Sequence, residues 1–192
     1  MSPYSIIYAD PPWKRDRWSD KAQFHSGEKH YPTMSIEELC AMPVEKIADK
    51  NCLLFMWVVG FELDGAIEVM KAWGFEYITI AFNWVKTNKD GSVWMGLGHW
   101  SRQGSEICLM GKRGKPKRFS KSVMQVIISE KQKHSKKPDE VRERIVELAG
   151  DLPRVELFAR SQTQGWDVFG NEVEGSIRLL TPRAADAIEP RR

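Results

Sequence analysis

The feature that most constrains the fold is a short apolar run that stops at an aspartate and two prolines: Ile6-Ile7-Tyr8-Ala9-Asp10-Pro11-Pro12-Trp13. An uninterrupted apolar run of this length predicts a strand that is buried on both faces. Proline lacks a backbone N–H and disfavours helix in the residue before it, so the chain continues here as neither a helix nor a paired strand. A carboxylate and a large aromatic ring therefore follow the carboxyl end of a buried strand, where open α/β sheets bind ligands.

Apolar segments alternate with helical patterns along the rest of the chain. Further strands are expected over residues 52–59, 75–85, 106–110, 123–128, 154–160 and 165–172, and helices over 35–43, 62–73 and 138–150. A capping-box pattern at Ser35 and Glu38 marks one helix start, and Gly74 and Gly150 mark two helix ends. Strands that alternate with helices indicate an α/β fold with a doubly wound, mostly parallel sheet.

Length and composition predict one domain with a short tail. Of the 192 residues, 42% are hydrophobic, which is enough for a substantial core over residues 1–175. Residues 176–192 are rich in Pro, Arg and Ala and are expected to form a flexible tail. No segment approaches the roughly 18 apolar residues of a membrane span, and the chain enters a strand at once, without the pattern of a signal peptide. We therefore expect a cytoplasmic protein with no membrane partner.

The cysteines and histidines do not form a recognisable ligand pattern. Cys40, Cys52 and Cys108 are odd in number and lack C-x-x-C spacing, which favours reduced thiols. The histidines likewise have no partners at the spacing of metal ligands. We expect no metal site.

Positive charge is gathered in three clusters although the net charge is only +3. The clusters are Lys112, Arg113, Lys115, Lys117, Arg118 and Lys121; Lys131, Lys133, Lys136 and Lys137; and Lys14, Arg15 and Arg17. Basic loops that are interleaved with aromatic residues suit a polyanion with stackable bases. Any one cluster alone fits a solvated loop equally well, but three together favour a nucleic-acid partner.

The residues after the first strand suit methyl transfer to an exocyclic amine. The lone pair of an adenine amine is delocalised into the ring, which makes the nitrogen a poor nucleophile. The Asp10 carboxylate and the Pro11 carbonyl can accept both amine hydrogens and stabilise the charge that develops on the nitrogen. Trp13 offers a ring on which the base can stack. The alternative is a turn that ends a strand, with a capping aspartate and a core tryptophan.

From about Ile6 to Glu172 the sequence resembles the MT-A-seventy-like family of adenine-N6 methyltransferases. The resemblance lies in eight blocks in order: Asp10-Pro11-Pro12-Trp13, Tyr31-Pro32-Thr33-Met34, Leu54-Phe55-Met56-Trp57-Val58, Trp84-Val85-Lys86-Thr87-Asn88, Gly98-His99-Trp100, His134-Ser135-Lys136-Lys137-Pro138-Asp139-Glu140, Arg154-Val155-Glu156-Leu157-Phe158-Ala159-Arg160 and Gly170-Asn171-Glu172. The resemblance implies a Rossmann-like methyltransferase fold, in permuted order because the catalytic strand precedes the cofactor strand, and it implies S-adenosylmethionine as methyl donor.

The resemblance also implies roles for individual residues. The catalytic group is Asp10, Pro11, Pro12 and Trp13. The cofactor contacts are Asp10, Lys137, Glu156, Phe158, Arg160, Asn171 and Glu172. The substrate contacts are Tyr31, Trp84, Lys86 and Arg102. Each has an ordinary alternative: a solvated helix-start lysine for Lys137, an ion-paired strand residue for Glu156, and a turn for Asn171 and Glu172.

The expected function is therefore adenine-N6 methylation of DNA, with the target base flipped out or taken from a single strand. Methylation of RNA is an alternative, because no residue distinguishes the two polymers. A catalytically inactive nucleic-acid-binding partner with the same fold is another. The oligomeric state is left open between a monomer and a homodimer.

Overall fold

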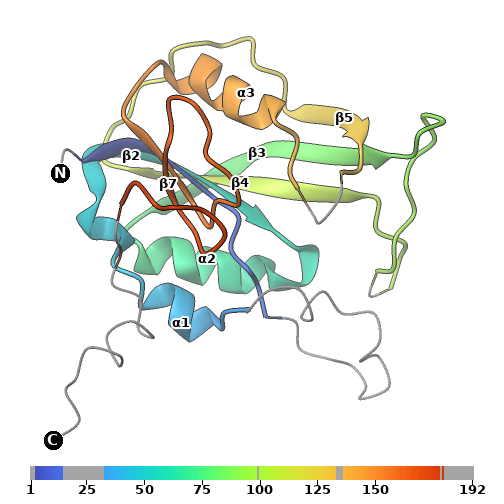
Figure 1. The fold of residues 1–192 in the computed structure, drawn as a ribbon, viewed down its shortest axis with the longest axis horizontal. Coiled ribbons are helices and arrows are strands. Elements are labelled where there is room, and N and C mark those ends of the chain that lie inside the picture. The colour runs from blue at the N-terminus through green and yellow to red at the C-terminus, as the bar shows by residue number, and fades with distance from the viewer. Residues whose placement is uncertain (1–2, 15–32, 99, 133–135, 178, 180–192) are drawn as a thin grey trace, which may run out of the picture.

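The computed structural model describes residues 3–14, 33–98, 100–132, 136–177 and 179, and in them a single seven-stranded sheet has the order β5-β3-β4-β2-β1-β6-β7 (Figure 1). The strands are β1 (Tyr4–Ala9), β2 (Ala48–Val58), β3 (Glu76–Thr87), β4 (Ser105–Arg113), β5 (Val126–Glu130), β6 (Arg154–Leu157) and β7 (Asp167–Phe169). The α-helices are α1 (Ile36–Cys40), α2 (Leu63–Ala72) and α3 (Glu140–Ala149), with short 3-10 turns η3 (Val44–Lys46) and η4 (Gly60–Glu62). None of the helices in these segments is long and apolar enough to cross a bilayer.

The sheet is mostly parallel, as expected, with one reversal. β1 is parallel to β2 and β6, β6 to β7, and β3 to β5. β4 runs antiparallel to both of its neighbours, β2 and β3. Parallel neighbours need a crossover, usually a helix, whereas β3 and β4 are joined by the loop 88–104, so β4 returns beside β3 in the opposite direction. The expected α/β architecture is thus confirmed, and it is consistent with a Rossmann-like methyltransferase fold.

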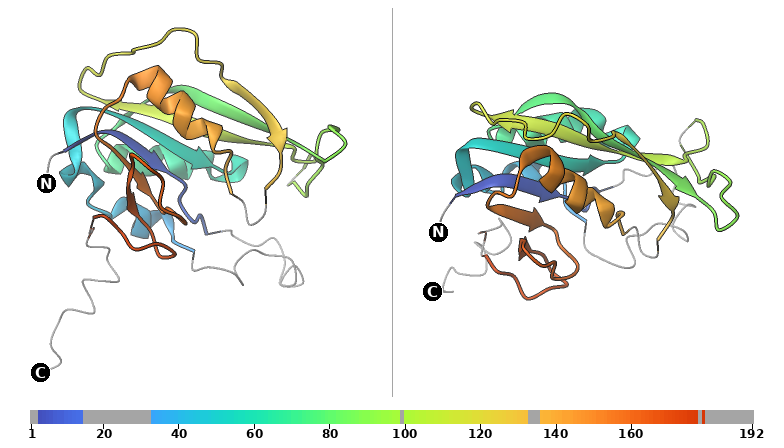
Figure 2. Two further views of the ribbon diagram at one scale, coloured as in Figure 1. Left: turned by 45° about the horizontal axis from the view of Figure 1, so that its top comes forward. Right: turned by 90° about the horizontal axis from the view of Figure 1, so that it is seen from above.

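Helices cover both faces of the sheet (Figure 2). Leu39 of α1 and Val69 of α2 belong to one buried cluster with Ile7 of β1. Ile145 of α3 belongs to a second cluster with Tyr8 of the same strand. Because successive strand residues point to opposite faces, β1 supplies both cores, which explains its uninterrupted apolar sequence.

Local signals set the helix limits. Ser35 and Glu38 form both hydrogen bonds of a capping box at the start of α1. α2 is followed by Gly74 at φ +82°, a conformation that favours glycine. α3 begins at Glu140 rather than at Pro138, because Asp139 occupies the N-cap position.

The chain continues to pack beyond the domain boundary that the sequence predicts. Ile177 and Leu179 are buried in the same cluster as α1 and α2, and the backbone N–H of Ser176 donates to the Val168 carbonyl at 2.9 Å. The packed region therefore extends past residue 175. Residues 180–192 lie outside the described residues, so the tail stays a prediction.

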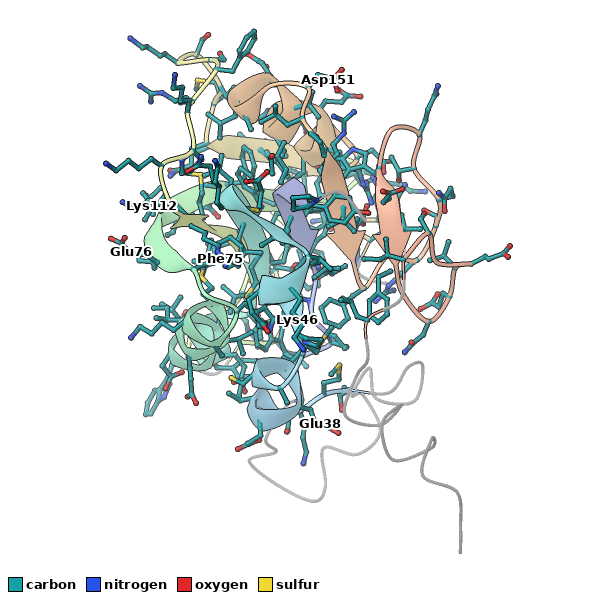
Figure 3. All side chains as sticks on the ribbon, turned by 90° about the vertical axis from the view of Figure 1, so that its left-hand side faces the viewer. Glu38, Lys46, Phe75, Glu76, Lys112 and Asp151 are labelled. Carbon is teal, nitrogen blue, oxygen red and sulfur yellow. The ribbon has the colours of Figure 1, made fainter. Side chains whose placement is uncertain are left out.

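The parallel strands give the sheet an amino edge, where they begin, and a carboxyl edge, where they end. Figure 3 looks onto the amino edge, where Lys112 near the end of the reversed β4 lies beside Glu76 at the start of β3, with Nζ 3.4 Å from Oε2. Asp10 follows the last residue of β1 and therefore lies at the carboxyl edge.

We predict that Trp73→Phe lowers the free energy of unfolding by about 1–3 kcal/mol. The Trp73 ring is fully buried, and its Nε1 donates to the Leu39 carbonyl at 2.7 Å, which ties α1 to the residue that ends α2. Urea unfolding measures the loss. Trp100→Phe is the matched control, since Trp100 is 93% exposed and should change stability by less than about 0.5 kcal/mol. Equal effects of the two substitutions would contradict this packing.

Candidate active site at the carboxyl edge

The register of three parallel strands places the ends of β1, β6 and β7 together. Ala9 pairs with Leu157, and Leu157 pairs with Phe169. The residues that follow these strands, Asp10 and Phe158 among them, therefore share the carboxyl edge of the sheet. This is the position that the apolar run and the two prolines predict for Asp10.

Lys137 binds Asp10 directly. Its Nζ donates to Oδ1 at 2.8 Å and to Oδ2 at 2.7 Å. The same Nζ lies 3.3 Å from Oε2 of Glu106, whose other carboxylate oxygen accepts a hydrogen bond from Lys86. Asp10, Lys137, Glu106 and Lys86 thus form a chain of alternating charge, which we call the carboxylate–lysine chain.

The carboxylate–lysine chain is largely removed from water. The side chains of Lys137, Glu106 and Lys86 are 9%, 12% and 13% exposed, whereas that of Asp10 is 27% exposed. Burial alone would raise the pKa of Glu106, but the ammonium groups of Lys137 and Lys86 outweigh it and hold this pKa below its ordinary value. Burial would likewise lower the pKa of Lys137, but the carboxylates of Asp10 and Glu106 raise it above its ordinary value. Glu106 and Lys137 thus stabilise each other's charged form.

Three tryptophans flank the two ammonium groups. Nζ of Lys137 lies 5.4 Å from the centroid of the Trp57 ring. Nζ of Lys86 lies 4.9 Å from the Trp84 ring and 5.2 Å from the Trp94 ring. Cation–π attraction to these rings contributes about 0.5–2 kcal/mol at each site and compensates part of the cost of burying the lysines.

Trp84 is itself a core residue. Its ring is fully buried, and Nε1 donates to Oγ of Ser129 at 2.9 Å. The structure therefore places it beneath Lys86, as a support for the ammonium group, and leaves its predicted contact with substrate unsupported. Lys86 belongs to the carboxylate–lysine chain, at the opposite end from Asp10, and its predicted contact with substrate stays a prediction.

The structure places the Trp13 ring in the core, and its predicted role at the target base stays a prediction. Its ring is 8% exposed and belongs to the core, and Nε1 donates to the Trp57 carbonyl at 3.0 Å. A ring that is buried in this way offers little surface to a stacking base. The alternative of a core tryptophan fits better, because the indole anchors the segment after Asp10 to the end of β2.

The two prolines are held by backbone hydrogen bonds. The Pro11 carbonyl accepts from the N–H of Trp13 at 2.9 Å, and the Pro12 carbonyl accepts from the N–H of Met34 at 2.8 Å. A carbonyl oxygen has two lone pairs, so one at Pro11 stays available for the predicted amine hydrogen. The fixed turn orients this carbonyl beside Asp10.

Glu156 is engaged elsewhere. Both of its oxygens accept from Arg142 of α3, Oε2 from Nε and Oε1 from Nη2, each at 2.7 Å. The Glu156 carboxylate is also buried. This bidentate pair supports the alternative of an ion-paired strand residue and does not support the predicted cofactor contact. It locks α3, and hence the segment that carries Lys137, onto β6.

The other predicted cofactor residues line the ends of β6 and β7. Phe158 follows β6 with φ +63°, an uncommon conformation for a residue other than glycine. Nε of Arg160 lies 3.9 Å from Oε1 of Glu172, and Asn171 and Glu172 are exposed. This set has the donors and acceptors that an adenosyl amino-acid cofactor needs: the Arg160 cation for its carboxylate, and amide and carboxylate oxygens for its ribose hydroxyls. The residues present therefore fit such a group.

The remaining predicted features are Tyr31, Arg102 and the basic clusters. Tyr31 is outside the described residues. Arg102 is exposed in the loop between β3 and β4. The first basic cluster begins at Lys112, at the amino edge, so the structure separates it from Asp10 (Figure 3). Of the second cluster, Lys137 and Lys131 lie at or near the carboxyl edge.

Metal ligands are not gathered anywhere in the described segments. No group of three His, Cys, Asp or Glu side chains in them is placed to hold an ion.

The sequence analysis missed Glu106, Trp57 and Trp94. Glu106 is a charged residue near the start of an otherwise apolar strand, and this is the one sequence signal that could have identified it. Its pairing with Lys86 becomes visible only with the register that sets Trp84 opposite Glu106.

We predict that Glu106→Gln lowers the free energy of unfolding by about 3–5 kcal/mol near pH 7, because it leaves two buried ammonium groups short of a carboxylate. The pKa of Glu106 is lowered in the folded state, so its contribution is present above its ordinary pKa of 4.5 and is lost as the pH falls through the folded pKa. The difference between the two proteins should therefore shrink in acid. Urea unfolding across this range tests it, with exposed Glu143→Gln as control. A difference that is independent of pH would contradict the ion pairing.

Residues 4–172 match the MT-A70 family. The chain is 33% identical to the type II methyltransferase M.MunI of Mycoplasma sp, over 95% of this chain and 84% of that protein. It is 32% identical to the human N(6)-adenosine-methyltransferase catalytic subunit METTL3, over 95% of this chain and 30% of that protein.

A Drosophila melanogaster N(6)-adenosine-methyltransferase MT-A70-like protein is also 32% identical, over the whole chain and 30% of its own length. This chain thus spans most of the Mycoplasma relative and about a third of the animal ones. Because the family match covers most of the chain and the first relative is covered nearly throughout, this chain belongs to the MT-A70 family of methyltransferases.

Proposed function

We propose that this protein transfers a methyl group from S-adenosylmethionine to the exocyclic N6 amine of adenine in DNA. The observation that carries the proposal is the position of the Asp10 carboxylate at the carboxyl edge. Both of its oxygens accept hydrogen bonds from buried Lys137, and a fixed proline turn follows it. An oriented carboxylate next to a rigid carbonyl is the acceptor pair that an adenine amine requires. Membership of a methyltransferase family gives the same reaction class.

The role of Asp10 is to accept a hydrogen bond from the amine while charge develops on the nitrogen. The nitrogen lone pair forms the new N–C bond, and the surplus proton leaves to solvent or through Asp10. When bound, S-adenosylmethionine supplies a methyl group on a sulfonium sulfur, which takes the electron pair of the broken bond. Lys137 holds the Asp10 carboxylate in place, so little reorganisation is needed when the reaction occurs.

The cofactor is proposed to bind where β6 and β7 end. Lys137 and Arg160 would meet its carboxylate, and Asn171 and Glu172 its ribose hydroxyls. These strands follow β1 in the chain, so in this proposal the catalytic residue would precede the cofactor residues, and the motif order would be permuted. Residues 1–175 would form the core of this methyltransferase domain.

The choice of DNA rests on the relative that this chain spans most fully, a type II methyltransferase. The animal relatives that it matches over a third of their length are named adenosine methyltransferases, which makes RNA the alternative polymer. A protein that binds cofactor and nucleic acid without methyl transfer is the second alternative. We propose a cytoplasmic location, in keeping with the cysteine pattern.

We predict that Asp10→Asn lowers the rate of labelled methyl transfer to DNA by at least about a hundredfold, as expected when one preorganised electrostatic group is removed. The amide keeps the shape of the side chain but presents an N–H where an acceptor is needed. Transfer to DNA and to RNA of matched sequence is measured in parallel, and greater transfer to DNA is expected.

The control is Asp64→Asn, which changes an exposed carboxylate on α2. Its transfer rate should match that of the unmodified protein. An Asp10→Asn protein with the unmodified rate would refute the proposed role of Asp10, and preferential methylation of RNA would overturn the choice of DNA.

A further inference from the structure

We propose that Trp94, together with Lys131, binds the nucleotide that adjoins the target adenine, with the base stacked on the indole and the phosphate held by the ammonium group. This inference rests on the proposed function, because it assumes that the target base is brought to Asp10. It assigns a task to a residue whose importance the sequence did not indicate.

Trp94 lies directly beside the carboxylate–lysine chain. Its backbone N–H donates to the Lys86 carbonyl at 2.8 Å, so the loop after β3 folds back along the end of that strand. Nζ of Lys86 lies 5.2 Å from the centroid of the Trp94 ring. The Trp94 ring therefore contacts Lys86, which binds Glu106, and Glu106 in turn lies beside Lys137, the lysine that holds Asp10.

The indole is held in one orientation. A Cβ atom added at Gly96 would lie 2.2 Å from Cη2 of Trp94, so the ring packs against bare backbone that only glycine provides. Trp94 nevertheless stays half-exposed, unlike Trp13, Trp57 and Trp84. A fixed and partly exposed ring next to the site is what base stacking requires, since every base presents a flat face irrespective of sequence.

Lys131 supplies the charge. It follows β5, and its backbone N–H donates to the Thr87 carbonyl at 3.1 Å, which places it at the same end of the sheet. Its Nζ lies 5.0 Å from the centroid of the Trp94 ring. Lys131 is exposed, and no carboxylate pairs with it within the part of the chain that the structure describes. An arriving base would take the place of this ammonium group on the indole and leave it free to pair with the attached phosphate.

If the base next to the target adenine stacks on Trp94, removal of the Trp94 ring and removal of that base should have non-additive effects on binding affinity. The probe is a fluorescein-labelled single strand of about 16 thymidines with one central adenine, bound in the presence of S-adenosylhomocysteine. Further strands carry an abasic nucleotide on one or the other side of the adenine. For the unmodified protein, one abasic neighbour should weaken binding at least about fivefold.

Trp94→Leu keeps an apolar side chain against Gly96 but has no aromatic ring. It should weaken binding of the intact strand by a similar factor and abolish the effect of the abasic neighbour, which is the sign of direct interaction in a thermodynamic cycle. Trp94→Phe should restore much of the affinity and the coupling. Val93→Ala changes the adjacent, exposed residue of the same loop and should behave as the unmodified protein.

The salt dependence of binding affinity tests the proposed contact between Lys131 and phosphate. Lys131→Gln should reduce the slope of log affinity against log salt concentration by about 0.7, the value for one contact with a single strand. Lys71→Gln, which removes an exposed lysine of α2, should leave the slope unchanged.

Additive losses for Trp94→Leu and the abasic neighbour, or unchanged binding by Trp94→Leu, would overturn the stacking site. An unchanged slope for Lys131→Gln would overturn the phosphate contact. If the unmodified protein methylates DNA but shows no coupling, this inference fails while the proposed function stands. If coupling is found without methyl transfer, the stacking site stands and the catalytic proposal fails.

Discussion

The site depends on one buried ammonium group, that of Lys137, between the carboxylates of Asp10 and Glu106. Removing an ammonium ion from water costs several kcal/mol, and only well-placed partners compensate for it. The partners come from β1 and β4, which flank β2, while Lys137 itself precedes α3. The apolar contacts of α3 and its Arg142–Glu156 pair with β6 therefore deliver Lys137 to Asp10. A buried chain of charges is a poor way to gain stability, so its presence at the carboxyl edge favours a functional reason.

The parts of this arrangement that depend on local sequence could be predicted. The strand before Asp10, the capping box at Ser35 and the end of α2 at Gly74 follow from patterns only a few residues long. The role of Glu106 could not be predicted, because it depends on the register between β3 and β4. The same is true of Trp13, whose burial depends on packing against the end of β2, and of Glu156, whose partner lies on a helix that the strand sequence does not specify.

The sheet also separates charges that look alike in the sequence. β4 has nine residues and spans about 27 Å from the carboxyl edge to the amino edge, at about 3.3 Å for each residue. Glu106 lies at one end of it and the first basic cluster begins at the other. Composition alone grouped these lysines and arginines with those near Asp10, whereas the fold separates the first basic cluster from the end of the sheet where Lys131 and Lys137 lie. The proposed recognition of nucleic acid near the target therefore assigns the contacts to Trp94 and Lys131 rather than to total charge.

The central claim is that the carboxyl edge converts adenine to its N6-methyl form. Identification of the product tests this claim most directly: the unmodified protein is incubated with S-adenosylmethionine and DNA, and the digested nucleosides are analysed by mass spectrometry against standards. The account predicts N6-methyl-2′-deoxyadenosine as the product. A methyl group on another base or at another position of adenine, or no methylated nucleoside in either DNA or RNA, would contradict it.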